Sequence, residues 1–246
     1  MVGADCVPTF GQPQSIRMKD QTGVVAALLE AEKQAFTLFD EAVFRGLIVP
    51  GKSERALNSE MYELADELLG VKKFWHKRIV RAGANTLFPY RENPPDLILQ
   101  NDDILFFDFG PVFEDWEADI GKTFVIGENI LKKKLQRDTE AAWIEGREWF
   151  VAHPNCTGSE FYHYTSELAK KYGWEFGGEH CGHLIGKFPH EKIEGESRFN
   201  YIHPDNHEPM SAPGKETLIR RWIYEIHFID RKAQIGGFYE AFVGPY

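Results

Sequence analysis

The chain has 246 residues, enough for one large domain or two small ones, and its 43% hydrophobic and 27% charged residues are typical of a folded globular protein. A formal net charge of −10 repels polyphosphates and anionic lipids, so nucleic acid and a membrane surface are poor partners. Three scattered cysteines without a CxxC pair exclude a disulfide framework, and we expect neither an export signal nor a membrane span, hence a cytoplasmic protein.

The start of the sequence is predicted to differ from the remainder. Residues 1–23 contain two prolines and no hydrophobic periodicity, so we expect an arm that stays mobile or crosses to a partner subunit. We expect residues 24–246 to form a single domain. Apolar residues keep helical spacing over 24–47, and Ser53 can cap a second helix that ends at Gly70.

Strands and a second pair of helices are predicted next. Strand-like apolar runs lie at 79–82, 104–109 and 122–126. Helical spacing then restarts over 131–151, and a shorter helix ends before Gly173. The sequence therefore reads as two helices, a set of strands, and two helices again.

The second helix of each pair carries a similar buried stripe. Five positions recur with a shift of 104 residues: Leu57, Met61, Leu64, Ala65 and Leu68 correspond to Phe161, Thr165, Leu168, Ala169 and Tyr172. An internal duplication and a chance match both explain this correspondence. An aperiodic, proline-rich stretch over 189–216 is typical of a lid, a binding loop or an oligomer contact. The runs 217–229 and 234–243 are predicted to be strands that close the sheet.

Acidic residues interrupt four of the apolar runs. They are Asp108 in ILFFDF, Asp119 in WEADIGKTF, Glu225 in RWIYEIHFI and Glu240 in GFYEAFV. Acids are seldom buried without a partner, because an isolated carboxylate loses several kcal/mol of hydration. Each acid could face solvent on a half-exposed strand or pair with an arginine such as Arg220, Arg221 or Arg231.

A third explanation joins the four acids to a histidine. His183 lies in GHLIGKFPHE, between glycines that let the backbone approach closely. Four carboxylates and a neutral imidazole carry about four negative charges, which two divalent cations would balance. Such ligands favour Mn, Co, Fe or Zn over metals that prefer thiolates.

These residues resemble the pita-bread metallopeptidase family, which contains methionine aminopeptidase, aminopeptidase P, prolidase and creatinase. The similarity covers about 24–246 and rests on three features: Asp119 follows Asp108 by 11 positions, His183 follows Asp119 by 64 positions, and His183 lies in a GHxxG frame. ADIGKTFVIG is closer to the prolidase branch. The resemblance implies an α+β pita-bread fold, a pseudo-two-fold repeat of helix pairs packed on a curved antiparallel sheet.

The resemblance also implies a role for each residue. Asp108 would bind one of two divalent cations, Asp119 and Glu240 would bridge both, and His183 and Glu225 would complete the second. A water molecule between the cations would supply the hydroxide nucleophile. Glu225 would act as the general base, and His190 would donate a hydrogen bond to the oxyanion.

One position departs from the family pattern. Family peptidases carry a histidine shortly before the first ligand strand, where this chain has Tyr90, which cannot become positively charged near neutral pH. His76 is a candidate substitute, although we expect a surface histidine at the end of a strand. His227 follows Glu225 by two residues, so it shares that strand face and lines the substrate pocket or belongs to the core.

The predicted function is a dinuclear metal-dependent hydrolase, an aminopeptidase or dipeptidase of Xaa-Pro type that acts on a small peptide or amide. A creatinase-like hydrolase of a C–N bond in a non-peptide metabolite is the alternative, because Tyr90 replaces the histidine and the domain that precedes the catalytic domain in prolidase is expected to be missing. A metal-free binding module is disfavoured, since all five ligands are present. A homodimer is compatible with the arm and the proline-rich loop.

Overall fold

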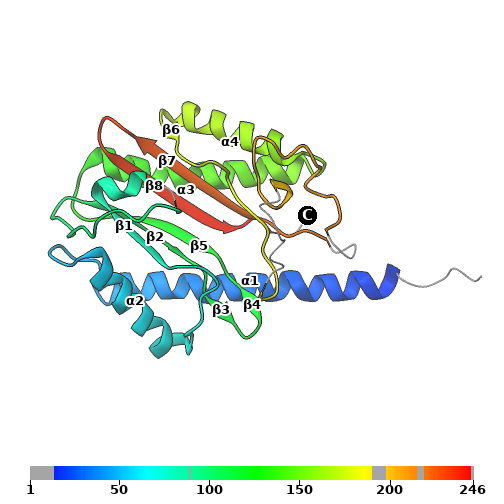
Figure 1. The fold of residues 1–246 in the computed structure, drawn as a ribbon, viewed down its shortest axis with the longest axis horizontal. Helices are drawn as coiled ribbons and strands as arrows, with labels where there is room; N and C mark the ends of the chain where they lie inside the picture. The colour runs from blue at the N-terminus through cyan, green and yellow to red at the C-terminus, as the bar shows by residue number, and fades with distance from the viewer. Residues whose placement is uncertain (1–13, 89, 190–197, 215–218, 245–246) are drawn as a thin grey trace, which may run out of the picture.

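The computed structural model describes residues 14–88, 90–189, 198–214 and 219–244, with a curved antiparallel sheet that carries helices on one face (Figure 1). Among these residues, six strands form the sheet in the order β1-β2-β5-β8-β7-β6. Their bounds are β1 Ile79–Ala82, β2 Ile104–Phe109, β5 Ile120–Val125, β8 Ile235–Phe242, β7 Ile223–Asp230 and β6 Glu175–Phe176. The predicted α+β class and antiparallel sheet are confirmed.

The first helix pair consists of α1, Gln14–Phe44, and α2, Glu54–Leu69. The predicted start of the first helix at residue 24 was wrong, because the stretch after Pro13 is rich in good helix formers and contains no further proline. Residues 1–13 of the predicted arm lie outside the described residues. Ser53 caps α2 as predicted, and Gly70 ends it in the left-handed conformation with φ 66°.

The second helix pair repeats this design. It consists of α3, Ile130–Ala152, and α4, Gly158–Tyr172. Thr157 caps α4 in a capping box with Glu160, and Gly173 ends it with φ 87°. The caps Ser53 and Thr157 lie 104 residues apart, so the shift seen in the sequence recurs in the helix boundaries and supports the duplication.

Several short elements were not predicted. They are the edge strand β6, the hairpin strands β3 Val112–Phe113 and β4 Trp116–Glu117, and the 3₁₀ turns η1 Gly83–Leu87 and η2 Arg198–Asn200. The hairpin strands have two residues each, too few to show periodicity. The described part of the proline-rich loop packs against the start of α4, where Ser159 N donates to the carbonyl of Asn206 at 2.7 Å.

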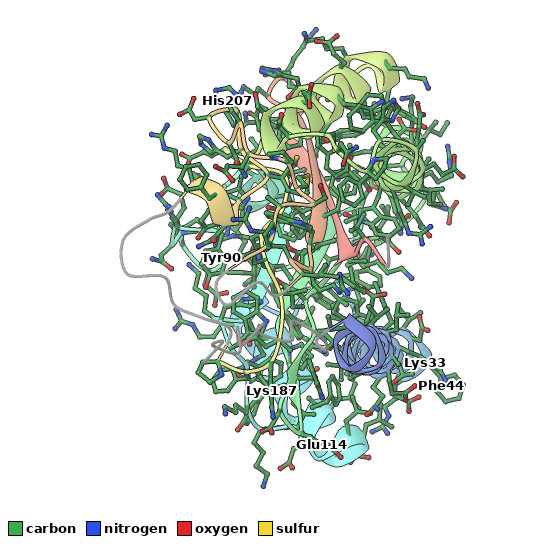
Figure 2. All side chains as sticks on the ribbon, turned by 90° about the vertical axis from the view of Figure 1, so that its right-hand side faces the viewer. Lys33, Phe44, Tyr90, Glu114, Lys187 and His207 are labelled. Atoms are coloured by element: carbon green, nitrogen blue, oxygen red, sulfur yellow. The ribbon has the colours of Figure 1, made fainter. Side chains whose placement is uncertain are left out.

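The two faces of the sheet carry different residues. On the helix side, Phe39 of α1 contacts Phe107 and Phe109 of β2, while Phe161 of α4 stacks on Tyr224 of β7. Burying each of these side chains contributes about 2 to 3 kcal/mol. Figure 2 looks along α1 and α3, with Tyr90 on the opposite side of the sheet. That opposite face carries the acids.

No helix in the described residues is long and apolar enough to cross a membrane.

Candidate metal centre

Three of the four acids lie in one row across the sheet. The antiparallel register places four residues side by side on β2, β5, β8 and β7: Asp108, Gly121, Glu240 and Glu225. Directly paired residues project to the same face of a sheet, so the three carboxylates share the face opposite the helices. Asp119 lies just before β5, two residues ahead of Gly121, and reaches the same cluster.

Gly121 leaves the space in which Asp108 and Glu240 approach each other. Its register partners are Asp108 on β2 and Glu240 on β8, and its pair with Glu240 joins β5 to β8. A Cβ atom at this position would lie 2.4 Å from the ring of Phe238 and 3.0 Å from Cβ of Glu240. A larger residue would therefore push apart the strands that carry the acids.

Asp119 lies between two histidines. Its Oδ2 is 3.0 Å from Nε2 of His183, and its Oδ1 is 3.1 Å from Nε2 of His76. Nε2 of His76 also lies 3.6 Å from Asp108 Oδ1, and Nε2 of His183 lies 3.7 Å from Glu240 Oε1. In the described part of the chain, these residues form two groups of potential metal ligands that share Asp119.

The expected surface position of His76 was wrong. Its side chain is only 8% exposed, because the loop before β1 turns inward and directs the imidazole at the acids. This contact joins residues 43 apart in the sequence, so no local pattern could predict it. In the run KFWHKR, Trp75 and His76 stand among basic residues without a spacing that marks a ligand.

Glu225 lies at the β7 end of the row, with Asp108 at the β2 end. Its Oε1 lies 2.6 Å from Nδ1 of His180, whose ring packs against Tyr201 at 4.8 Å between centroids. The side chains of Glu225 and His180 are 14% and 32% exposed. His180 was not among the predicted site residues, although it lies three residues before His183 in the same glycine-containing loop.

The electrostatics of the cluster favour a bound cation. Burial, together with neighbouring carboxylates, raises the pKa of Asp108 and of Glu240 well above the usual range. Burial acts to raise the pKa of Asp119 as well, but His76 and His183 lower it. Burial alone would lower the pKa of His76, yet Asp119 and Asp108 raise it to about 9. The closely packed carboxylates therefore repel one another, and they stabilise a positive charge placed among them.

The donor atoms fit divalent cations. Carboxylate oxygens with imidazole nitrogens suit Mn, Fe, Co and Zn, and the two ligand groups meet at a shared carboxylate, as in centres that hold two metals. Arg231, one of the arginines considered as a partner of the acids, pairs instead with Glu175 at 3.2 Å. A bound cation would offset the repulsion that raises the pKa of Asp108 and Glu240.

The sequence profile of metallopeptidase family M24 matches residues 26–234. The chain belongs to metallopeptidase family M24. It is 25% identical over 168 residues to an Xaa-Pro dipeptidase of Pyrococcus furiosus. The aligned stretch covers 66% of this chain and 47% of the relative. The chain spans about half the length of the curated relatives that it matches.

Solved structures share the fold of this M24 chain. A dipeptidase from Pyrococcus horikoshii OT3 is similar over 93% of this chain and 60% of its own, with a TM-score of 0.69 and 23% identity. A methionine aminopeptidase from Rickettsia prowazekii is similar over 91% of this chain and 92% of its own, with a TM-score of 0.63 and 18% identity. The predicted family and pita-bread fold are confirmed.

The remaining predicted site residues of the M24 chain lie in different surroundings. The ring of Tyr90 packs against His76 at 5.6 Å between centroids, and its hydroxyl accepts a hydrogen bond from the backbone N–H of Lys77 at 3.3 Å. His227 is buried, and its Nε2 lies 2.8 Å from the carbonyl oxygen of Thr86. Burial lowers the pKa of His227, so the neutral ring donates to that carbonyl. His190 lies outside the described residues.

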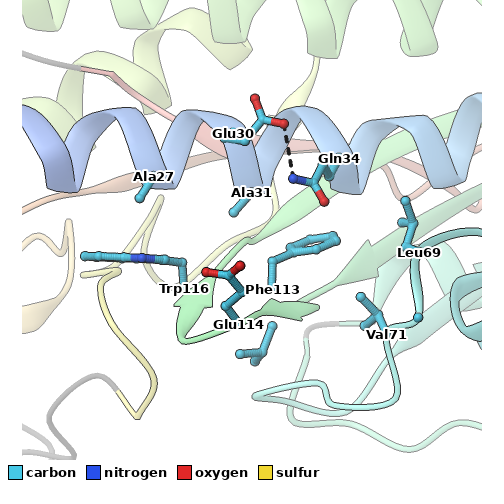
Figure 3. Close-up of a pocket in the computed structure, with 11 residues that line it drawn as sticks. Ala27, Glu30, Ala31, Gln34, Leu69, Val71, Phe113, Glu114 and Trp116 are labelled. Atoms are coloured by element: carbon cyan, nitrogen blue, oxygen red, sulfur yellow. Dashed lines mark hydrogen bonds between the residues drawn. The ribbon is translucent and has the colours of Figure 1, made fainter.

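A cavity of about 440 Å³ lies apart from the acid row of this M24 domain. Figure 3 shows it between α1 and the β3–β4 hairpin, where Phe113 and Trp116 face Ala27 and Ala31. None of the residues that line it belongs to the two ligand groups in the described structure. This cavity is therefore not part of the candidate metal centre, which the acids and histidines form.

Proposed function

We propose that this chain is a dinuclear metal-dependent peptidase that acts on Xaa-Pro peptides, as an aminopeptidase or as a dipeptidase. The observation that carries the proposal is the sharing of Asp119 between two ligand groups, one with His76 and Asp108 and one with His183 and Glu240. Membership of metallopeptidase family M24 supports peptide hydrolysis. Two curated relatives are named Xaa-Pro dipeptidases, which supports the substrate class.

The ligand set would bind Mn, Co, Fe or Zn. When bound, two such cations would lower the pKa of a water molecule and polarise the peptide carbonyl. Asp108, Asp119, His183 and Glu240 would hold the cations in the buried part of the row, and Glu225 would complete the set from β7. Burial of these ligands strengthens their attraction for a cation, because water screens it less there.

Glu225 would move the proton in the reaction. It stands at the β7 end of the row with its side chain 14% exposed, and it would take a proton from the attacking water and deliver it to the leaving amine nitrogen. His180 lies 2.6 Å from Oε1 of Glu225 and would position that carboxylate. The hydroxyl of Tyr90 accepts from Lys77 N and still has its own hydrogen to donate toward a substrate oxygen.

An activity screen tests the proposal. The purified chain is stripped with a chelator, reloaded separately with Mn, Co, Fe or Zn, and assayed on Xaa-Pro dipeptides, longer Xaa-Pro peptides, Met-initiated tripeptides and creatine. We expect metal-dependent cleavage of an Xaa-Pro bond with at least one metal. Hydrolysis of creatine without cleavage of any peptide would contradict the proposal and support the alternative drawn from Tyr90.

A further inference from the structure

His76 is held against the acids by its neighbour Trp75. The backbone N–H of Trp75 donates to the carbonyl of Gly110 at 2.9 Å, and its indole N–H donates to the carbonyl of Ala118 at 2.9 Å. These carbonyls belong to the segments that carry Asp108 and Asp119. The loop that bears His76 is therefore fastened to both acidic segments, next to the carboxylates that the imidazole faces.

Gly110 provides the room for this arrangement. A Cβ atom at Gly110 would lie 2.2 Å from Cδ2 of His76 and 2.4 Å from Nε1 of Trp75. Real Cβ atoms do not approach other atoms so closely, and the atoms they would meet here belong to packed rings. A side chain at position 110 would therefore displace the imidazole of His76 from its place beside the acids.

His76 directs Nε2 at the acids, 3.1 Å from Asp119 Oδ1 and 3.6 Å from Asp108 Oδ1, where it would give up any hydrogen in order to bind a cation. Its Nδ1 lies 2.8 Å from the carbonyl oxygen of Lys77, which can only accept, so Nδ1 carries the hydrogen. Histidines that bind metals donate their other ring N–H in this way. His183 has the same arrangement, with Nδ1 2.8 Å from the carbonyl of Leu184.

We propose that His76 is a direct ligand of the metal centre, through Nε2, and binds the same cation as Asp108 and Asp119. This inference rests on the dinuclear centre of the proposed function. Each cation would then be held by one imidazole, His76 on one side of Asp119 and His183 on the other. Neighbouring ligand atoms on one cation lie about 3.0 to 3.4 Å apart, for metal–ligand bonds of about 2.1 Å, and Nε2 of His76 lies 3.1 Å from Asp119 Oδ1.

A competing arrangement keeps His76 protonated as a positive counter-charge in place of one cation. The two arrangements predict opposite effects of removing the side chain. A ligand that is lost weakens metal binding, whereas a positive charge that is lost from the site strengthens it. The ligand arrangement is favoured because four carboxylates with neutral imidazoles balance two divalent cations.

The test counts imidazoles and measures metal affinity, both without an activity assay. Metal analysis of the zinc-loaded wild-type protein should give two cations per chain, and X-ray absorption should give on average one imidazole for each. In His76→Ala, the average should fall to half an imidazole per cation at saturating zinc. The weaker dissociation constant should rise at least tenfold, because even outer partners of ligands contribute about 10- to 100-fold to affinity.

His163→Ala is the matched control, because His163 is an exposed histidine of α4, and we expect it to change neither quantity. Two cations with a single imidazole between them in the wild-type protein would overturn the inference, as would unchanged or tighter binding in His76→Ala. The count of imidazoles per cation in the wild-type protein tests the inference even if His76→Ala fails to fold. Two imidazoles for two cations in a protein that cleaves no peptide would uphold the inference and refute the proposed function, whereas a wild-type protein that binds no cation would refute both.

Discussion

The cluster of acids has two ends, one around Asp119 and one around Glu225, whose side chains differ in how far they are shielded from water. Around Asp119, the side chains of Asp119 and His76 are 3% and 8% exposed, and each has a fixed partner. At the other end, Glu225 and His180 are 14% and 32% exposed and contact each other at 2.6 Å. A shielded end binds cations strongly, and an open end can exchange protons with water. The difference therefore suggests a division between holding metal and moving protons.

Replacement of Asp119 should have the largest effect. Asp119→Asn removes the charge shared by both ligand groups, so bound metal should fall well below two per chain, and kcat/KM should fall about 10³-fold or more, as expected for several kcal/mol of lost stabilisation. Metal analysis and peptide kinetics measure the two effects. Asp115→Asn is the control, because Asp115 is exposed and its side chain pairs with Lys187, away from the ligand groups. Full metal content in Asp119→Asn would refute the shared role.

Replacement of Glu225 should separate the two ends. Glu225→Gln keeps the shape of the side chain but removes its ability to take a proton, so kcat should fall about 10²- to 10⁴-fold. Metal content should fall less than in Asp119→Asn, because the ligand groups described around Asp119 remain complete. Glu179→Gln, at a neighbouring exposed glutamate, serves as the control. If Glu225→Gln loses as much metal as Asp119→Asn, the two ends do not differ in role.

A smaller effect, on stability, is expected from replacing Gly121, which pairs with both Asp108 and Glu240. Gly121→Ala places a Cβ atom 2.4 Å from the ring of Phe238, so we expect a loss of about 1 to 3 kcal/mol in the free energy of unfolding and a Tm lower by about 2 to 12 °C. In contrast, Gly23→Ala in α1 has no atom within 4 Å of the new Cβ and should stabilise the helix by up to about 1 kcal/mol. Thermal melts of both variants check the predicted opposite signs.

Local sequence patterns predicted the elements that carry the site. The caps Ser53 and Gly70, the strand at 79–82 and the strand at 104–109 lie where the sequence placed them, because caps and apolar runs are local signals. The start of α1 could not be located this way, since the residues after Pro13 allow a helix without an apolar stripe.

The acids were found because a charge within an apolar strand is conspicuous in the sequence. Asp108, Asp119, His183 and Glu240 converge in the structure, and Glu225 lies beside them in the row. His180 was not predicted as a site residue, and His76, a candidate substitute for the family histidine, was expected at the surface, because the contacts of both depend on how loops fold back over the sheet. A histidine between a tryptophan and a lysine has no spacing that distinguishes a buried ligand from a surface residue.

Anomalous diffraction from crystals grown with saturating manganese tests the central claim most directly. We expect two anomalous peaks about 3.5 to 4 Å apart. One should lie between Asp108 and Asp119, and the other between Asp119 and Glu240. Well-ordered carboxylates that each bind separate water molecules, with no anomalous peak among them, would contradict the account.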